Sequence, residues 1–274
     1  PSLFNLSVRK LPSVPQHCKA RQYADDVSLY KAGKNVEQLC KELTEDIVKV
    51  KEFLAARGLL LNPSKTQFVV FRSKCKPLDP SVALQLGEVT INPSAHIRYL
   101  GVVLDEHLSF GEHVSQLERK VGSKLAMFRK VRDHMTVTAK RAFYICSIQT
   151  ILEYGSNSFA HCLSVTLHDR LVRLSNRALR IVFSMPRFSD VSLVNARHHI
   201  LPLSVRYQFK LYILVFRVLN QVTTTLLTDC FCLRSTSTRT NSCTRSQVSS
   251  SVTLPKAKTR FGLFSVSFIG SDRW

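Results

Sequence analysis

The pattern of apolar residues changes near residue 110, and this change limits the folds open to the chain. Up to about residue 106, short apolar runs alternate with polar residues and with turn-forming Gly, Pro and Asn, a pattern typical of short strands and hairpins. From residue 111 to 220, apolar residues recur every three or four positions, as in packed amphipathic helices. The chain is therefore predicted to be an α+β protein in which a helical region follows a mixed one.

The first part contains clear local signals. Residues 17–31 predict a β-hairpin, and residues 36–54 predict a helix with Asn35 as its N-cap and Gly58 after its end. Four further elements follow in the prediction: a turn at Asn62-Pro63-Ser64, a strand at Gln67–Phe71, a hairpin at 82–91 around Gly87, and a strand at 96–105 interrupted by Gly101.

The second part predicts helices over 113–131 and at about 138–154, 166–184 and 203–220. The apolar face expected for the first of these is Val114, Leu117, Val121, Leu125, Phe128 and Val131. A Ser- and Thr-rich stretch at 222–253 reads as a linker, and alternation returns in the tail at 254–274. The predicted division is thus 1–106, 107–221, 222–253 and 254–274.

The chain carries 39 Lys and Arg against 19 Asp and Glu, a formal charge of +20. The surplus is concentrated in residues 111–220, where 17 basic residues accompany 6 acidic ones. Such a surplus favours a polyanionic partner, most often nucleic acid, over a merely soluble basic protein or a membrane-surface binder. No apolar run approaches the length that spans a membrane.

The eight cysteines form no CxxC pair and have no histidine at zinc-finger spacing. Free thiols are therefore expected, with Cys40 and Cys146 at positions predicted to be buried in helices. Cys230 and Cys232 could contact a metal ion, but nothing in the sequence completes a four-ligand site around them.

Two adjacent acids, Asp25 and Asp26, stand in the sequence QYADDVSLY, and the 24 residues before Asp25 contain no Asp or Glu. Neighbouring carboxylates repel each other unless a cation lies between them. At a hairpin turn they form a compact anionic site that suits Mg²⁺, and two-metal chemistry on phosphates uses such carboxylates. Tandem acids in an exposed loop, however, are common and often only solvated.

Several motifs occur in one order along the chain: YADD at 23–26, a capped helix, GLLLNPSKTQFVVF, RYLGVVLD and a basic helical region. Together with the leading PSLFNLSVRKLPSVP and the late TRFGLFSVSFIGSDRW, they resemble the reverse transcriptases of non-LTR, LINE-type retrotransposons, with jockey-type elements most similar. The resemblance implies a partial right-hand polymerase palm followed by an all-α, thumb-like region. It also implies an RNA template, a DNA primer or target, dNTPs and Mg²⁺ as partners of the intact enzyme.

The resemblance assigns roles within the palm. Asp25 and Asp26 would be metal-binding catalytic carboxylates, with Tyr23 and Ala24 near the primer terminus or incoming nucleotide. Lys65 would lie near the triphosphate and donate a proton to departing pyrophosphate, although it could also be only an exposed turn lysine.

Two further sets of contacts with nucleic acid follow from the same resemblance. Tyr99, Leu100 and Gly101 match the primer-grip hairpin, where glycine lets the backbone approach the primer closely. The thumb-like helices would lay a basic face along the template–primer duplex. The residues expected on that face are Arg119, Lys120, Lys124, Arg129 and Lys130.

The sequence departs from the family pattern at Arg9 and Lys10, where the family has an Asn-Asp pair. Proline at residue 1, a first methionine at 127 and the missing upstream catalytic carboxylate lead us to expect a fragment that does not polymerise alone. The competing readings are a non-catalytic nucleic-acid-binding module derived from a mobile element and a helical scaffold whose charge is incidental. The family leads us to expect an intracellular location, in the nucleus or in a cytoplasmic ribonucleoprotein.

Overall fold

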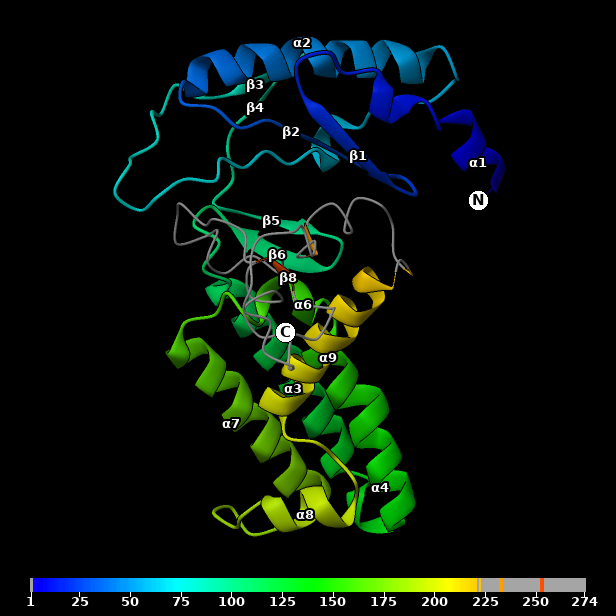
Figure 1. The fold of residues 1–274 in the computed structure, drawn as a ribbon, viewed down its shortest axis with the longest axis vertical. Coiled ribbons are helices and arrows are strands. Elements are labelled where there is room, and N and C mark those ends of the chain that lie inside the picture. The colour runs from blue at the N-terminus through cyan, green and yellow to red at the C-terminus, as the bar shows by residue number, and fades with distance from the viewer. Residues whose placement is uncertain (1, 221, 223–231, 234–251, 254–274) are drawn as a thin grey trace, which may run out of the picture. The chain divides into compact units, whose positions relative to one another are not determined.

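The structure is a computed structural model that describes residues 2–220, 222, 232–233 and 252–253 (Figure 1). The chain divides into two compact units. The first contains the residues up to 99 together with 104–108, and the second contains 100–103 and the described residues from 109 onward. Helices and small antiparallel sheets are both present, which is compatible with the predicted α+β class.

The first unit is built from short hairpins and one long helix, α2. Its strands pair in sequence order, β1 with β2 and β3 with β4, and both pairs are antiparallel. The elements up to residue 105 are α1 (Ser2–Ser7), η1 (Leu11–Ser13), β1 (Lys19–Tyr23), β2 (Asp26–Tyr30), α2 (Val36–Ala55), η2 (Pro63–Lys65), β3 (Leu84–Leu86), β4 (Val89–Ile91), β5 (His96–Tyr99) and β6 (Val102–Asp105).

Helix α2 begins and ends where the sequence predicts. The Asn35 side chain accepts a hydrogen bond from the Gln38 N–H at 3.3 Å, which caps one of the free backbone donors of the first turn. After the helix, Gly58 adopts φ +70°, a left-handed conformation that glycine reaches without steric cost. The local signals for this helix are therefore confirmed.

The buried face of α2 packs against β3 and carries the core of the first unit. Apolar residues of both hairpin strands β3 and β4 contribute to it. The buried members of this core are Cys40, Ile47, Phe68, Val82, Leu84, Leu86 and Ile91.

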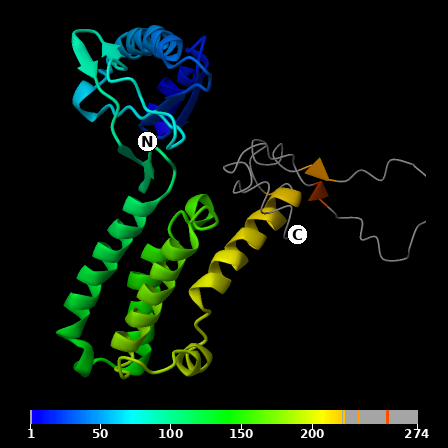
Figure 2. The same ribbon diagram turned by 90° about the vertical axis from the view of Figure 1, so that its left-hand side faces the viewer.

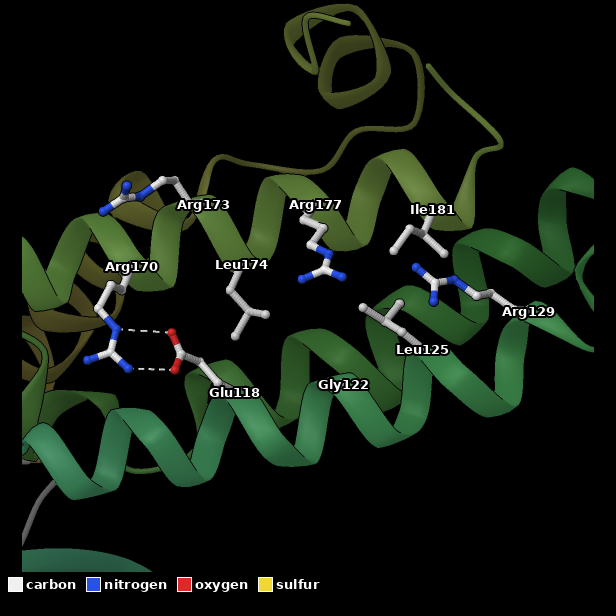
Figure 3. Close-up of a pocket in the computed structure, with 9 residues that line it drawn as sticks. All are labelled: Glu118, Gly122, Leu125, Arg129, Arg170, Arg173, Leu174, Arg177 and Ile181. Carbon is white, nitrogen blue, oxygen red and sulfur yellow. Dashed lines mark hydrogen bonds and ion pairs between the residues drawn. The ribbon is translucent and has the colours of Figure 1, made fainter. Parts of the chain in front are cut away.

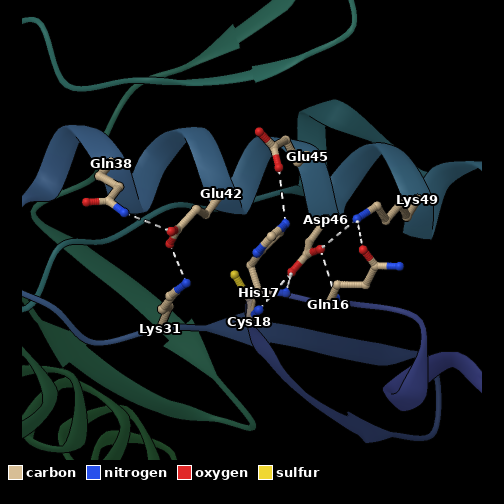
Figure 4. Close-up of polar contacts among 9 residues, drawn as sticks. All are labelled: Gln16, His17, Cys18, Lys31, Gln38, Glu42, Glu45, Asp46 and Lys49. Carbon is tan, nitrogen blue, oxygen red and sulfur yellow. Dashed lines mark hydrogen bonds and ion pairs between the residues drawn. The ribbon is translucent and has the colours of Figure 1, made fainter.

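Asp46 on α2 is fully buried and anchors the segment that leads into β1 (Figure 4). Its carboxylate accepts hydrogen bonds from the backbone N–H groups of Gln16, His17 and Cys18 at 2.9, 2.8 and 2.7 Å. Burial alone would raise the pKa of Asp46, but these hydrogen bonds outweigh it and lower the pKa below its ordinary value of 3.8. Burial, followed by Asp46 itself, raises the pKa of Cys18 to about 11.

Two strand predictions in the first unit are wrong. Gln67–Phe71 forms no strand; Phe68 is buried in the core beside α2 and Val70 packs against that core, while Phe71 is exposed. The stretch 96–105 is a hairpin of β5 and β6 rather than one strand. Leu100 and Gly101 both have positive φ, +45° and +84°, and this two-residue turn reverses the chain.

The second unit is helical over the described residues from 109 to 220. The long helices α3, α7 and α9 run side by side in Figure 2, and α7 contacts both of the others. The elements are α3 (Gly111–Arg129), η3 (Arg132–His134), α4 (Val137–Phe143), the π-helical turn η4 (Tyr144–Gln149), α5 (Thr150–Glu153), α6 (Ser156–Phe159), α7 (Val165–Val182), α8 (Ser192–Arg197) and α9 (Leu203–Leu219).

The predicted long helices of this unit are confirmed, with α4, η4 and α5 forming the continuous segment expected at 138–154. Val131 does not join the buried face of α3, because the helix ends at Arg129 and Val131 is 50% exposed. Cys146 is exposed rather than buried. Tyr144 and Ile148 occupy the buried side of η4, so Cys146, two positions from each, faces away from the core.

No helix among the described residues is long and apolar enough to cross a membrane. Strands β7 (Cys232–Leu233) and β8 (Val252–Thr253) form a short antiparallel pair. The rest of the predicted linker 222–253, apart from residue 222, and the whole predicted tail 254–274 lie outside the described residues, as does Cys230.

Candidate functional site

The two acids lie at the turn of the β1–β2 hairpin, as the sequence predicts. Tyr23 pairs with Asp26 across the hairpin, which leaves Ala24 and Asp25 as the turn residues. Ala24 has φ +52°, a region that costs a non-glycine residue about 1–3 kcal/mol. The Gln22 side-chain amide donates to the Ala24 carbonyl at 2.9 Å and supports this strained turn.

Both carboxylates are exposed, and neither forms an ion pair or side-chain hydrogen bond with another residue that the structure describes. Two unneutralised charges on consecutive residues repel each other, and a bound cation relieves that repulsion. Mg²⁺ is held in proteins by one or two carboxylates while it keeps several waters. The pair therefore fits one such ion, although no third His, Cys, Asp or Glu completes a metal-binding group within the described part of the chain.

Tyr99, at the end of β5, reaches the same hairpin. Its hydroxyl lies 3.3 Å from the Ser28 Oγ on β2. Residues two apart on a strand share a face, so Ser28 lies on the face that carries Asp26 and its cross-strand partner Tyr23. The first unit thus gathers Tyr23, Asp26 and Tyr99 on one exposed hairpin face, from segments 71 residues apart.

Lys65 ends the short helix η2, and its side chain is exposed. The Asn62 side chain accepts hydrogen bonds from the Ser64 N–H at 3.0 Å and from the Ser64 hydroxyl at 2.7 Å, which fixes the turn before it. The Lys65 ammonium forms no ion pair with any residue in the described ranges, and no hydrogen bond joins it to the acidic hairpin among these residues. Its role at the triphosphate therefore stays a prediction.

The turn at Leu100 and Gly101 is supported from within the second unit. The Tyr154 hydroxyl donates to the Leu100 carbonyl at 2.8 Å. A Cβ added to Gly101 would lie 2.9 Å from Cε1 of the Tyr154 ring. Glycine is thus required here both by its φ of +84° and by the packing of Tyr154.

The basic residues expected to contact nucleic acid are all exposed on α3 or directly after it. Arg119 is neutralised, because its guanidinium lies 2.7 Å from a Glu112 carboxylate oxygen. The others have no acidic partner among the residues that the structure describes. These unpaired residues are Lys120, Lys124, Arg129 and Lys130.

Comparison with known proteins shows which family this part of the chain resembles. The model of the family described as reverse transcriptase (RNA-dependent DNA polymerase) matches residues 1–104. Residues 1–104 of the 274-residue chain are thus similar to reverse transcriptases. The resemblance to retrotransposon reverse transcriptases is therefore confirmed.

A relative from Drosophila melanogaster, named probable RNA-directed DNA polymerase from transposon BS, is 26% identical over 199 residues. That alignment covers 69% of this chain but 22% of the relative, so the chain spans about a fifth of the length of the protein it matches. The search of solved structures gave no significant match.

The reverse transcriptase match includes the acidic hairpin, Lys65 and the Tyr99–Gly101 turn, whereas α3 lies beyond it. Sequence reasoning missed three residues that support these positions: Asp46, Ser28 and Tyr154. The sequence did contain a signal for Asp46, because an acid on the apolar side of a predicted helix needs hydrogen-bond donors in the core. The other two contacts have no local signal, because each joins segments far apart in the chain.

Replacing Gly101 by alanine is expected to lower the free energy of unfolding by about 1–2 kcal/mol. The alanine would have to keep a positive φ, and its Cβ would displace the Tyr154 ring. Urea unfolding followed by far-UV circular dichroism measures the change. The matched control is Gly122→Ala on α3, because a Cβ added at Gly122 meets no atom within 4 Å. Unchanged stability in Gly101→Ala would mean that the turn does not need glycine.

Proposed function

We propose that this chain is the section of an RNA-directed DNA polymerase that holds the acidic pair and the primer grip, followed by thumb helices that contact the template–primer duplex. The observation that carries the proposal is the 3.3 Å contact between the Tyr99 and Ser28 hydroxyls. It joins the primer-grip-like strand to the strand of Asp26 within the region that matches the reverse transcriptase family. Sequence motifs far apart in the chain thus meet on one hairpin face.

In this proposal each residue acts through its own chemistry. Asp25 and Asp26 hold Mg²⁺, which when bound activates the primer hydroxyl and stabilises charge on the phosphates. Tyr23 is 69% exposed beside the acids and offers an aromatic surface to the primer terminus or the nucleotide. Lys65 supplies a proton to departing pyrophosphate, as its exposed ammonium allows.

The test is primer extension on an RNA template. The protein encoded by the complete open reading frame that contains these residues is expected to extend a DNA primer with dNTPs in the presence of Mg²⁺ but not of EDTA. The 274-residue chain alone is expected to give no extension, since its described acids form no three-membered metal group. Extension that is indifferent to EDTA would reject the proposal.

A second candidate function, a non-catalytic nucleic-acid-binding module, is favoured by the unpaired cations of α3. It predicts binding of a template–primer duplex without extension by the complete protein. The primer-extension assay therefore distinguishes the two functions.

Both functions predict a strong salt dependence of duplex binding. If Lys120, Lys124 and Lys130 each neutralise one phosphate, replacing all three by glutamine should lower the slope of log affinity against log salt by about 2.7. Fluorescence anisotropy with a labelled RNA–DNA duplex between low and high salt measures this slope. Arg119→Gln is the control, because that arginine is already paired with Glu112. An unchanged slope in the triple variant would exclude this face as the duplex-binding surface.

A further inference from the structure

A groove of about 450 Å³ runs between helices α3 and α7 of the second unit (Figure 3). The arginines of α7 have no role in the proposed function above. The groove contains cations from both helices on an apolar floor. It is lined by Glu118, Gly122, Leu125, Arg129, Arg170, Arg173, Leu174, Arg177 and Ile181.

The negative charge that lines the groove is neutralised. Glu118 on α3 accepts two hydrogen bonds from Arg170 on α7, from Nε at 3.1 Å and from Nη2 at 2.6 Å. This fork-like pairing satisfies both carboxylate oxygens and fixes the two side chains across the end of the groove (Figure 3). Glu118 is therefore not available to neutralise the other arginines.

Two of those arginines point into the groove from opposite helices. In Figure 3, Arg177 extends from α7 toward α3, and Arg129 reaches from α3 beneath Ile181. Neither forms an ion pair with any residue within the described part of the chain. Two like charges in one groove repel each other, and a bound anion turns that repulsion into attraction.

Arg173 differs from these two although it also lines the groove. Its side chain points away from α3 in Figure 3, and its Nε donates to the Asp169 carbonyl at 3.3 Å. It therefore serves as a matched control on the same helix.

The groove floor between the two cations is apolar. Leu125 is buried, and Leu174 and Ile181 are half-buried beside it. Guanidinium groups bind phosphate with two parallel hydrogen bonds, and burial of part of a base against the apolar floor would remove apolar surface from water. Helix axes in contact lie about 8–10 Å apart, so a groove between them suits one strand rather than a double helix.

We propose that the α3–α7 groove binds single-stranded RNA, with Arg129 and Arg177 on successive phosphates and a base against Leu174. The inference rests on the proposed function, which supplies an RNA template, and adds a binding site for the unpaired part of that strand. An acidic peptide is the competing occupant, and the competition with polyglutamate described below tests it.

The experiment measures the affinity of the 274-residue chain for a fluorescein-labelled single-stranded RNA by anisotropy. The double variant Arg129→Gln/Arg177→Gln should bind about tenfold more weakly, with the salt slope reduced by about 1.4, or 0.7 for each lost phosphate contact. Arg173→Gln should keep the parent affinity and slope. Equal unfolding midpoints of the variants in urea exclude loss of the fold as the cause.

A variant expected to bind more tightly distinguishes a specific effect on the groove from a general loss of structure. Glu118→Gln frees Arg170 as a third unneutralised cation, so the affinity for single-stranded RNA should rise severalfold and the slope should steepen by about 0.7. Unchanged affinity in both the double variant and Glu118→Gln would overturn the proposal. So would displacement of the RNA by polyglutamate at an equal charge concentration.

Failure of this inference and failure of the proposed function give different results. If only the groove assignment is wrong, the complete protein extends primers while the double variant binds RNA as well as the parent. If only the polymerase assignment is wrong, the groove variants change RNA binding while no Mg²⁺-dependent extension is found.

Discussion

Replacing Asp25 by asparagine is expected to lower the rate of RNA-templated primer extension by about 10³-fold in the protein from the complete open reading frame. Asparagine keeps the size of the side chain but removes the charge that would hold Mg²⁺ at the hairpin turn. A metal ion contributes several kcal/mol to stabilising charge in phosphoryl transfer, and about 4 kcal/mol corresponds to this factor. Single-turnover extension of a labelled primer by one nucleotide measures the rate directly.

The matched control is Glu88→Gln, which removes an exposed carboxylate from the turn of another hairpin, β3–β4, in the same unit. It should retain the parent rate. Asp25→Asn should unfold at the parent urea concentration, because its side chain makes no contact with another described residue that the fold could lose. A variant that is fully folded and fully active would exclude Asp25 from metal binding.

Replacing Asp46 by alanine is expected to lower the free energy of unfolding by about 3 kcal/mol. The change leaves the N–H groups of Gln16, His17 and Cys18 without their carboxylate acceptor, and hydrogen bonds to charged groups contribute about 1.5–3 kcal/mol each. The loss stays below the sum of three because Gln16 and His17 are exposed and water can replace their bonds. Urea unfolding at neutral pH gives the value.

The same residue predicts a pH dependence. The folded-state pKa of Asp46 lies below the ordinary value of 3.8, so the folded protein resists protonation more than the unfolded chain does. Its contribution to stability is therefore complete above pH 3.8 and is lost as the pH falls through the lower folded-state pKa. The Asp46→Ala variant should show a smaller loss of stability than the parent over this acidic range.

Glu45→Ala provides the control for both measurements. Glu45 precedes Asp46 on α2, and its pair with His17 at 3.2 Å is largely exposed, so its loss should cost less than about 1 kcal/mol. Equal destabilisation by the two variants would contradict the anchoring role of Asp46. Because Asp46 fixes the segment that enters β1, we also expect its loss to reduce primer extension through a loosened acidic hairpin.

Much of the local structure could be predicted from neighbouring residues. The cap at Asn35, the turns around Asp25 and Gly87, and the helical periodicity of α3 and α7 depend on interactions within a few positions. The predictions that were wrong depend instead on packing between distant parts of the chain. Gln67–Phe71 has the apolar pattern of a strand but is held by packing against α2, and Cys146 follows a register set by the burial of Tyr144.

The sequence alone determined the motif order, the basic surplus and the placing of the two acids at a hairpin turn, because these depend only on composition, on order along the chain or on neighbouring residues. Only the tertiary structure decided that Tyr99 meets Ser28, that Asp46 holds the start of β1, and that Arg129 and Arg177 share a groove. These contacts join segments roughly 30 to 70 residues apart, and no local preference specifies which distant side chains will meet. Packing of the two cores fixes them, since burial of apolar faces sets the position of every polar group attached to them.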